Sequence, residues 1–198
     1  MKGRTGPSAV RILAGRWKGR RLDVPAHARP TSGRAREALF DILQDSVVGI
    51  RVLDLYAGSG AIGLEALSRG AAEAVFVESD RRALESNIAR FRPDPDTVRI
   101  LPDDARRATE MLAREGQRFD LVFADPPYES GPRALSQSLG ELVAPGGRLV
   151  VQTDSISEAP EIADLLPAER RAYGRNVFWL FERNAAGYSR SRTPYRAW

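Results

Sequence analysis

The chain has no cysteine and a single histidine, His27. The absence of cysteine excludes disulfides, thiolate metal sites and cysteine nucleophiles, and one histidine cannot form a metal cluster. The chain also lacks any run of about 18 apolar residues, the length of a membrane-spanning helix. Residues 1–21 carry charges where a signal peptide needs an uninterrupted apolar stretch. We therefore expect a soluble, cytoplasmic protein with no metal and no membrane contact.

Acidic residues are scarce at the beginning of the chain. Residues 1–36 contain ten Lys or Arg and one acidic residue, Asp23, although the net charge of all 198 residues is only +4. A basic segment on an otherwise acidic body indicates a polyanionic partner such as nucleic acid. The alternative is a solvated surface in an arginine-rich protein, but it does not explain why the charge is concentrated at one end.

Residues 9–25 alternate apolar and basic positions around Gly15 and Gly19, which predicts a short hairpin. Trp17 in this segment is either a platform for an unpaired base or the hairpin's own core. Pro30 and a cap at Thr31 or Ser32 then predict a helix that begins near residue 33.

From residue 50 onward, apolar segments alternate with amphipathic ones. We predict strands at 51–56, 74–78, 98–101, 119–124 and 147–153, and helices at 61–69, 80–91, 104–115 and 132–143. Repeated strand–helix units predict an α/β fold with a parallel, Rossmann-like sheet covered by helices. A helix at 157–166 and strands at 168–173 and 175–182 would complete the fold, and residues 184–198 are expected to form an extended or disordered basic tail.

A glycine-rich segment, "VLDLYAGSGAIGLEALSRGA", begins in the first predicted strand and carries Asp54 at the end of that strand. Gly58, Gly60 and Gly63 have G-x-G-x-x-G spacing, and glycine lets a backbone turn tightly against a ligand where a helix begins. The spacing alone fits a nucleotide-like cofactor, including a nicotinamide cofactor, or a tight turn without a ligand.

Acidic side chains also follow the next two predicted strands. Glu78 stands where a carboxylate can accept both ribose hydroxyls of an adenosine. Asp104 could accept a hydrogen bond from the adenine amine, or it could simply cap the next helix. Because parallel strands end at the same edge of a sheet, we expect these acids and Asp54 to converge on an adenosine-bearing cofactor.

The fourth predicted strand ends in "ADPPY", residues 124–128. Pro126 and Pro127 stiffen the backbone and cannot donate, so their carbonyl groups stay free to accept hydrogen bonds. Asp125 beside such carbonyls suits a planar exocyclic amine, because two acceptors can hold its two N–H bonds. Tyr128 could stack on the ring that bears the amine. This segment therefore predicts an amine-binding active site.

Five segments together resemble the bacterial RsmD-type methyltransferases: "RILAGRWKGRRL", "RPTSGRAREALF", "LDLYAGSGAIGLEALSRGA", "VFVESD" and "ADPPY". The resemblance extends from residue 10 to about residue 182. It implies a class I S-adenosylmethionine-dependent methyltransferase fold that methylates the N2 amine of a guanine in 16S ribosomal RNA. The family usually has an acid where this chain has Gly33, and residues 184–198 have no counterpart in it.

The resemblance also implies roles for individual residues. The catalytic residues would be Asp125, Pro126 and Tyr128. The cofactor would be held by Asp54, Tyr56, Gly58, Gly60, Glu78, Asp104, Thr31 and Arg34, with Glu78 at the ribose and Asp104 at the adenine. We assign RNA contact to Arg11, Arg16, Trp17, Lys18, Arg20, Arg21 and Arg36. For Arg36, the alternative is a surface ion pair with Glu37 or Asp41.

We expect three segments: a basic RNA-binding arm at residues 1–32, a methyltransferase domain at 33–183 and a basic tail at 184–198. The expected partner is 16S ribosomal RNA in a small-subunit assembly particle, and the expected state is a monomer. The alternatives are an amino-directed DNA methyltransferase acting on adenine N6 or cytosine N4, a nicotinamide oxidoreductase, and a noncatalytic RNA-binding module.

Overall fold

The structure, a computed structural model, is built on one seven-stranded sheet. It describes residues 10–25, 31–127, 136–154, 159–165, 167–174 and 176–184. The strands lie in the order β3-β2-β1-β4-β5-β7-β6. Their bounds are β1 Arg51–Leu55, β2 Glu73–Val77, β3 Val98–Leu101, β4 Phe119–Ala124, β5 Val143–Asp154, β6 Pro167–Tyr173 and β7 Asn176–Glu182. The first five strands pair in parallel and β7 is antiparallel to β5 and β6, which confirms the predicted α/β class.

Among the residues that the structure describes, one α-helix precedes the first strand, and four connect the parallel strands. They are α1 Gly33–Leu43, α2 Ala61–Ser68, α3 Arg82–Phe91, α4 Ala105–Arg114 and α5 Ser136–Leu139. Short 3-10 helices are η1 Gly15–Trp17, η2 Gln44–Val47, η3 Pro95–Thr97 and η5 Gly140–Leu142. Within the described ranges, none of the helices has the length and apolar character needed to cross a membrane.

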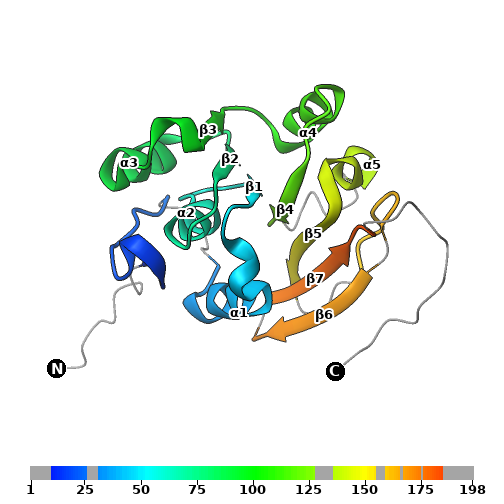
Figure 1. The fold of residues 1–198 in the computed structure, drawn as a ribbon, viewed down its shortest axis with the longest axis horizontal. Coiled ribbons are helices and arrows are strands. Elements are labelled where there is room, and N and C mark those ends of the chain that lie inside the picture. Colours follow the sequence, from blue (N-terminus) through cyan, green and yellow to red (C-terminus); the bar gives the residue numbers. More distant parts are fainter. Residues whose placement is uncertain are drawn as a thin grey trace.

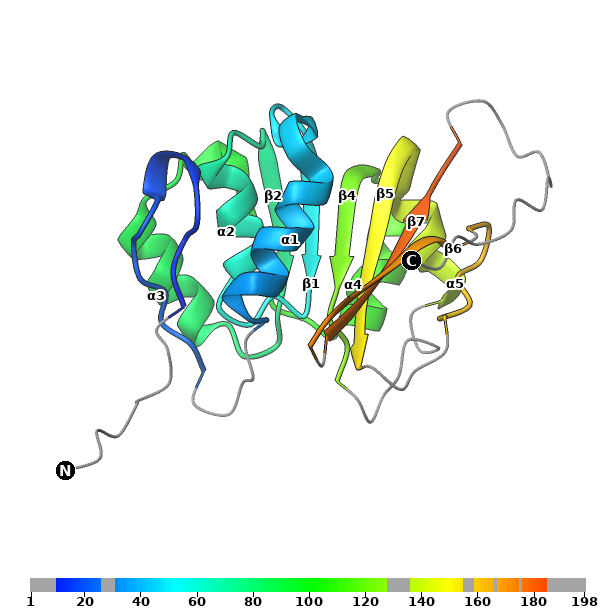
Figure 2. The same ribbon diagram turned by 90° about the horizontal axis from the view of Figure 1, so that it is seen from below.

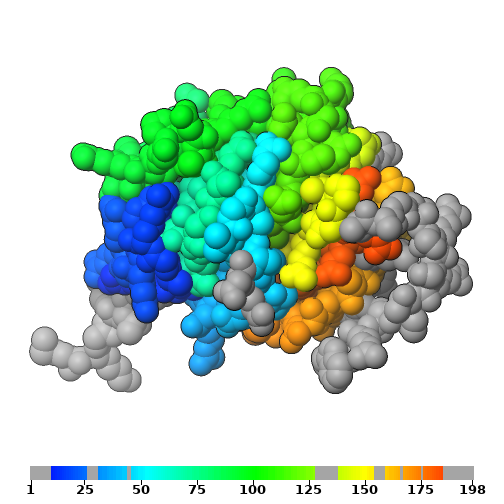
Figure 3. All heavy atoms as spheres, viewed as in Figure 1, coloured from blue at the N-terminus to red at the C-terminus, as the bar shows by residue number. Residues whose placement is uncertain are grey.

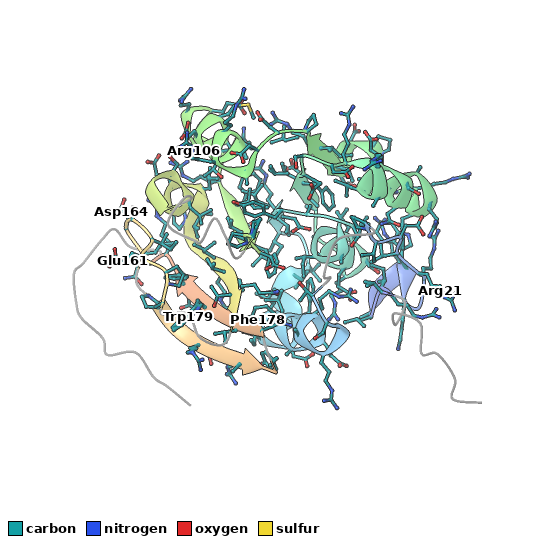
Figure 4. All side chains as sticks on the ribbon, turned by 180° about the vertical axis from the view of Figure 1, so that it is seen from behind. Arg21, Arg106, Glu161, Asp164, Phe178 and Trp179 are labelled. Carbon is teal, nitrogen blue, oxygen red and sulfur yellow. The ribbon has the colours of Figure 1, made fainter. Side chains whose placement is uncertain are left out.

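The two faces of the sheet carry separate apolar layers. Alternate residues of a strand point to opposite faces. Phe178 of β7 therefore packs in the layer that includes Leu64 of α2, whereas its neighbour Trp179 packs with Leu112 of α4 (Figure 4). Figures 1 and 2 show the sheet between the group α1, α2 and α3 and the group α4 and α5. The layers leave the ends of the strands, rather than their faces, available for a site.

Two segments differ from the helices predicted at 132–143 and 157–166. In the described part of the first, helix runs only from Ser136 to Leu142, and β5 begins at the next residue. The second prediction is wrong over residues 159–165, which form a turn closed by a bridge between Ile162 and Leu165. Asp164 in this turn has φ 63°, which a right-handed helix excludes. The tail predicted at 184–198 lies, apart from its first residue, outside the described residues.

Residues 10–25, which from here on we call the arm, form the predicted hairpin. The N–H of Leu22 donates to the carbonyl of Val10 at 2.8 Å, and the N–H of Ile12 donates to that of Arg20 at 3.0 Å. Figure 3 shows the arm lying against the body beside α2 and α3. An added Cβ at Gly15 would stand 1.8 Å from the carbonyl oxygen of Ser68. The arm therefore packs so closely on α2 that only glycine fits at this position.

A buried carboxylate, Glu65 of α2, fastens the arm to the body. Its Oε2 accepts the N–H of Leu13 at 2.7 Å, and its Oε1 accepts the N–H of Ala14 at 3.0 Å. Arg36 of α1 lies 3.8 Å from Oε2 and donates through Nη2 to the carbonyl of Arg11 at 2.8 Å. Glu65 and Arg36 are 0% and 1% exposed. The arm, α1 and α2 thus share one desolvated pair of opposite charges.

We expect Glu65→Ala to lower the free energy of unfolding by about 3 kcal/mol or more, because it leaves Arg36 buried without a counter-charge. Denaturant unfolding followed by circular dichroism measures the change. Glu110→Ala is the matched control, since Glu110 pairs with Arg106 and Arg114 on the exposed surface of α4. This control should cost less than about 1 kcal/mol. Equal losses for the two variants would contradict the role given to Glu65.

Candidate active site

Four carboxylates lie where β1 to β4 end, at what we call the carboxyl edge of the sheet. Asp54 is the fourth residue of β1, Glu78 directly follows β2, Asp104 lies three residues beyond β3, and Asp125 directly follows β4. In the parallel register, Leu55 of β1 stands opposite the last residue of β2 on one side and of β4 on the other. The sheet therefore brings together acids that are far apart in the sequence.

The segment between β1 and α2 is shaped by left-handed backbone conformations. The φ angles are 58° at Tyr56, 55° at Gly58 and 74° at Gly60, the residue that precedes α2. An added Cβ at Gly58 would have no neighbour closer than 4.0 Å, so this glycine leaves open space beside the backbone. An added Cβ at Gly63 would stand 2.3 Å from the ring of Phe76. The third glycine of the motif therefore serves the close packing of α2 on β2.

Glu78 is held against this glycine loop. Its Oε2 accepts the N–H of Gly58 at 2.7 Å, and its Oε1 accepts the N–H of Asp80 at 2.9 Å. The hydroxyl of Ser79 also lies 3.4 Å from Oε1, so Oε2 is the oxygen that keeps a lone pair for a hydrogen bond from a ligand. The Glu78 side chain is therefore held in a fixed position and still has hydrogen-bonding capacity for a ligand.

Asp104 caps helix α4. Its Oδ1 accepts the N–H groups of Arg106 and Arg107 at 2.9 and 3.3 Å, which confirms the capping role considered from the sequence. A contact with a ligand stays a prediction, and it would fall to the second oxygen, Oδ2. Burial raises the pKa of Tyr56 and the negative charge of Asp104 raises it further, so these two side chains are neighbours at the carboxyl edge.

Asp54 is 2% exposed, and its Oδ2 accepts the N–H of Gly63 at 3.0 Å. Burial raises the pKa of Asp54 to about 7, although the hydrogen bond from Gly63 opposes the shift. The nearby charges of Asp125 and Glu78 raise this pKa further. Asp54 therefore ties β1 to the first turns of α2, and it changes protonation state near neutral pH.

Asp125 is held by side chains from two other parts of the chain. Gln152 of β5 donates through Nε2 to Asp125 Oδ2 at 3.0 Å, and the hydroxyl of Thr31 lies 3.4 Å from the same oxygen. Burial raises the pKa of Asp125 to about 7, and the hydrogen bond from Thr31 partly offsets this effect. Pro126 is buried, whereas Tyr128 lies outside the described residues. Asp125 is thus a half-buried carboxyl group whose pKa lies well above that of an ordinary aspartate.

Within the part of the chain that the structure describes, no group of three or more His, Cys, Asp or Glu side chains is arranged to hold a metal ion. The polar groups at the carboxyl edge are hydrogen-bond acceptors and backbone N–H donors. They suit an organic ligand that carries hydroxyl and amine groups.

A family model described as "Conserved hypothetical protein 95" matches residues 10–182. Ribosomal RNA small subunit methyltransferase D of Escherichia coli (strain K12) is 34% identical over 196 residues, covering 93% of this chain and 96% of that protein. The chain belongs to the RsmD family.

Solved structures agree with membership of the RsmD family. The Escherichia coli protein yhhF superimposes with a TM-score of 0.76 at 34% identity, covering 89% of this chain and 98% of that one. A hypothetical protein of a Thermus species has a TM-score of 0.75 at 39% identity, covering 87% of this chain and 99% of that one. The likeness therefore extends over most of the chain.

Most of the residues to which the RsmD resemblance gave a cofactor or catalytic role lie at the carboxyl edge. They are Asp54, Tyr56, Gly58, Gly60, Glu78, Asp104, Asp125 and Pro126, and Thr31 reaches the same edge from the start of α1. Arg34 is exposed on the first turn of α1. The structure thus gathers these positions, and their individual roles toward a ligand stay predictions.

Two residues of the RsmD-family chain that we assigned to RNA are buried, and this assignment is corrected. Trp17 is 7% exposed and packs edge-to-face on Phe91, with ring centroids 5.3 Å apart, while Arg16 covers its ring at 4.1 Å. Arg36 is 1% exposed and faces Glu65 instead of Glu37 or Asp41. Both belong to the junction between the arm and the body. Arg11, Arg16, Lys18, Arg20 and Arg21 are exposed.

Sequence reasoning did not find Gln152. It is 5% exposed and stands in β5 beside Asp125, because Val151 pairs with Ala124 of β4. The sequence does hold a signal, a polar residue within the apolar strand "LVVQT". A buried polar side chain in such a strand needs a hydrogen-bond partner, but the sequence does not say which one.

The raised pKa of Asp54 predicts that stability falls as pH rises. The folded state binds this proton up to about pH 7, whereas an unfolded aspartate with a pKa near 3.8 releases it much earlier. The Asp54 contribution is therefore fully favourable below about pH 4 and is lost by about pH 7 to 8. We expect Asp54→Asn to be more stable than wild type at pH 8, by roughly 2–4 kcal/mol, and equally stable at pH 4.

Thermal or urea unfolding between pH 4 and 8 measures this difference. Asp96→Asn, a change of the same kind at an exposed residue, should unfold as wild type does at every pH. A constant difference between Asp54→Asn and wild type across this range would refute the inference.

Proposed function

We propose that this chain is an S-adenosylmethionine-dependent methyltransferase that methylates the N2 amine of a guanine in 16S ribosomal RNA. The observation that carries the proposal is the position of Asp125, directly after β4 and beside the glycine loop that follows β1. An amine bound at Asp125 would lie next to a ligand bound at that loop. The name of the Escherichia coli relative, a small-subunit ribosomal RNA methyltransferase, supports the choice of RNA.

The residues at the carboxyl edge fit S-adenosylmethionine. Glu78 keeps a free lone pair on Oε2 for a ribose hydroxyl, and Asp104 keeps Oδ2 for the adenine amine. The open space at Gly58 lets a ligand approach the backbone where α2 begins. Asp54 would lie beside the methionine part of S-adenosylmethionine. Tyr56, which lies near Asp104, would pack against the adenosine part.

Bound S-adenosylmethionine supplies an electrophilic methyl group on a sulfonium. The protein's part is to hold the guanine amine, a poor nucleophile because its lone pair is delocalised into the ring. Asp125 and the carbonyl of Pro126 accept the two N–H bonds, which favours a pyramidal nitrogen and directs its lone pair. The carboxylate also offsets the positive charge that grows on the nitrogen. Tyr128 would stack on the base.

The exposed cations of the arm provide an RNA-binding surface. Arg11, Arg16, Lys18, Arg20 and Arg21 all lie on this segment, and Figure 4 shows Arg21 at the outer rim of the molecule. Such side chains neutralise phosphates without reading the bases. The target guanine must leave its stack to reach Asp125, so a loop or a partly assembled small subunit is a better substrate than a duplex. We infer a monomer that acts in the cytoplasm without a metal ion.

Asp125→Ala should lower the rate of methyl transfer at least about a hundredfold, because the amine loses the acceptor that orients it. The affinity for S-adenosylmethionine, measured by calorimetry, should stay within about threefold. Transfer of labelled methyl groups to immature 30S particles from a strain that lacks the enzyme gives the rate. Asp120→Ala, at the exposed other end of β4, is the control and should keep normal activity.

Two outcomes would reject the proposed function. One is normal transfer by Asp125→Ala, and the other is methyl incorporation into duplex DNA but not into ribosomal particles. Mapping the modified nucleotide in the particles identifies the guanine.

The double variant Arg16→Glu, Lys18→Glu should bind RNA at least about tenfold more weakly than wild type in low salt. The slope of the logarithm of its RNA association constant against the logarithm of salt concentration should be smaller in magnitude by about two. Cofactor affinity should not change, because the arm does not line the carboxyl edge. The same reversal at Arg106 and Arg114 of α4 is the control; Arg106 lies far from Arg21 in Figure 4. Equal RNA affinity of the arm variant and wild type across a salt titration would exclude the arm as the RNA-binding surface.

A further inference from the structure

Three side chains from distant parts of the sequence form a closed contact around one oxygen of Asp125. Gln152 donates through Nε2 to Asp125 Oδ2 at 3.0 Å. The Thr31 hydroxyl lies 3.1 Å from Gln152 Oε1 and 3.4 Å from the same Asp125 oxygen. Thr31 lies two residues before α1, Asp125 directly follows β4, and Gln152 belongs to β5. The contact therefore exists only in the folded chain.

The number of available protons fixes the direction of these hydrogen bonds. A threonine hydroxyl has one proton, and the shorter of its two contacts is with Gln152 Oε1. When Thr31 donates to Oε1, the amide N–H of Gln152 faces Asp125 Oδ2. The opposite orientation would set the amide oxygen against the ionised carboxylate. The carboxylate of Asp125 therefore selects the amide orientation in which Nε2 donates to it, and Thr31 completes this arrangement by donating to Oε1.

The two oxygens of Asp125 consequently have different surroundings. Oδ2 accepts the N–H of Gln152 and has the Thr31 hydroxyl beside it at 3.4 Å, whereas Oδ1 receives no hydrogen bond from any residue in the described ranges. The charge of Asp125 raises the pKa of Asp54 of β1, so the two carboxyl groups repel each other when both are ionised. The donation from Gln152 opposes this repulsion and the effect of burial.

We propose that Gln152, held by a hydrogen bond from Thr31, is a positioning residue that occupies Oδ2 of Asp125 and leaves Oδ1 as the oxygen that accepts the substrate amine. The inference rests on the proposed function, since it assigns the amine to Asp125. Gln152 acts in two ways: it fixes the rotation of the carboxyl group, and it favours the ionised state that an acceptor needs. Its backbone position is set independently by the pairing of β5 with β4 and β7.

Gln152→Met tests this role because it preserves length and removes the donor. We expect kcat to fall ten- to a hundredfold, with the KM for S-adenosylmethionine unchanged within about twofold. The midpoint of the rise of kcat with pH should increase by about one unit, since one hydrogen bond to the carboxylate is lost. Thr31→Val should produce a smaller shift in the same direction. Gln152→Glu, which places a second carboxylate beside Asp125, should produce a larger one.

The matched control is Gln117→Met, the same change at the opposite edge of the sheet, where Gln117 accepts a hydrogen bond from Arg51. Its pH profile should coincide with that of wild type. If Gln152→Met lowers kcat without moving the midpoint, Gln152 has only a structural role and the proposal is overturned.

A second measurement does not depend on activity. In protein labelled with 13C at aspartate carboxyl groups, the Asp125 signal is assigned by its loss in Asp125→Asn, and its titration midpoint should rise in Gln152→Met. An unchanged midpoint overturns the inference even if the enzyme methylates RNA. The wild-type protein could instead fail to bind S-adenosylmethionine or to methylate ribosomal particles while the midpoint still shifts in Gln152→Met. That result rejects the proposed function, and with it the positioning role of Gln152 in methyl transfer. It retains the contact between Gln152 and Asp125.

Discussion

The parallel pairing of β1 with β2 on one side and β4 on the other is the constraint on which the site depends. It places the glycine loop, Glu78 and Asp125 at one edge of the sheet, although they are separated in the sequence by the helices between the strands. Helices cover both faces of the sheet, so its edge is left for ligands. The same pairing brings Asp54 and Asp125 close enough for their charges to interact, which contributes to the raised pKa of Asp54.

The arm is part of this architecture and not a separate lobe. Glu65, which is fully buried, satisfies two arm N–H groups and faces the guanidinium of Arg36. Asn87 of α3 adds a second connection, since its side chain bonds the backbone of Asp23 in the arm and the carbonyl of Ser59 in the glycine loop. The arm, where we propose that RNA binds, is therefore connected to the site that we assign to the cofactor.

Much of the fold could be predicted because each strand–helix unit carries its own periodicity. The strands 98–101 and 119–124 agree with the structure, and the other predicted strands overlap the observed ones. Residues 159–165 were predicted wrongly because an apolar pattern cannot reveal the left-handed conformation of Asp164. Trp17 stands among charged residues and Arg36 is itself charged, so the sequence left the burial of both undecided. They are buried because α2 and α3 supply Glu65 and Phe91, partners that are distant in the sequence.

The sequence by itself determined the α/β class, the order of the strands along the chain, the glycine loop and the acid that ends the fourth strand, because these depend on local spacing and residue type. Only the tertiary structure decided which of these residues are neighbours. It buried Asp54 and Asp125 deeply enough to raise their pKa values to about 7, and it placed Gln152 and Thr31 on one oxygen of Asp125. Burial and hydrogen bonding depend on what surrounds a side chain in space, and that is set by strand pairing between distant segments.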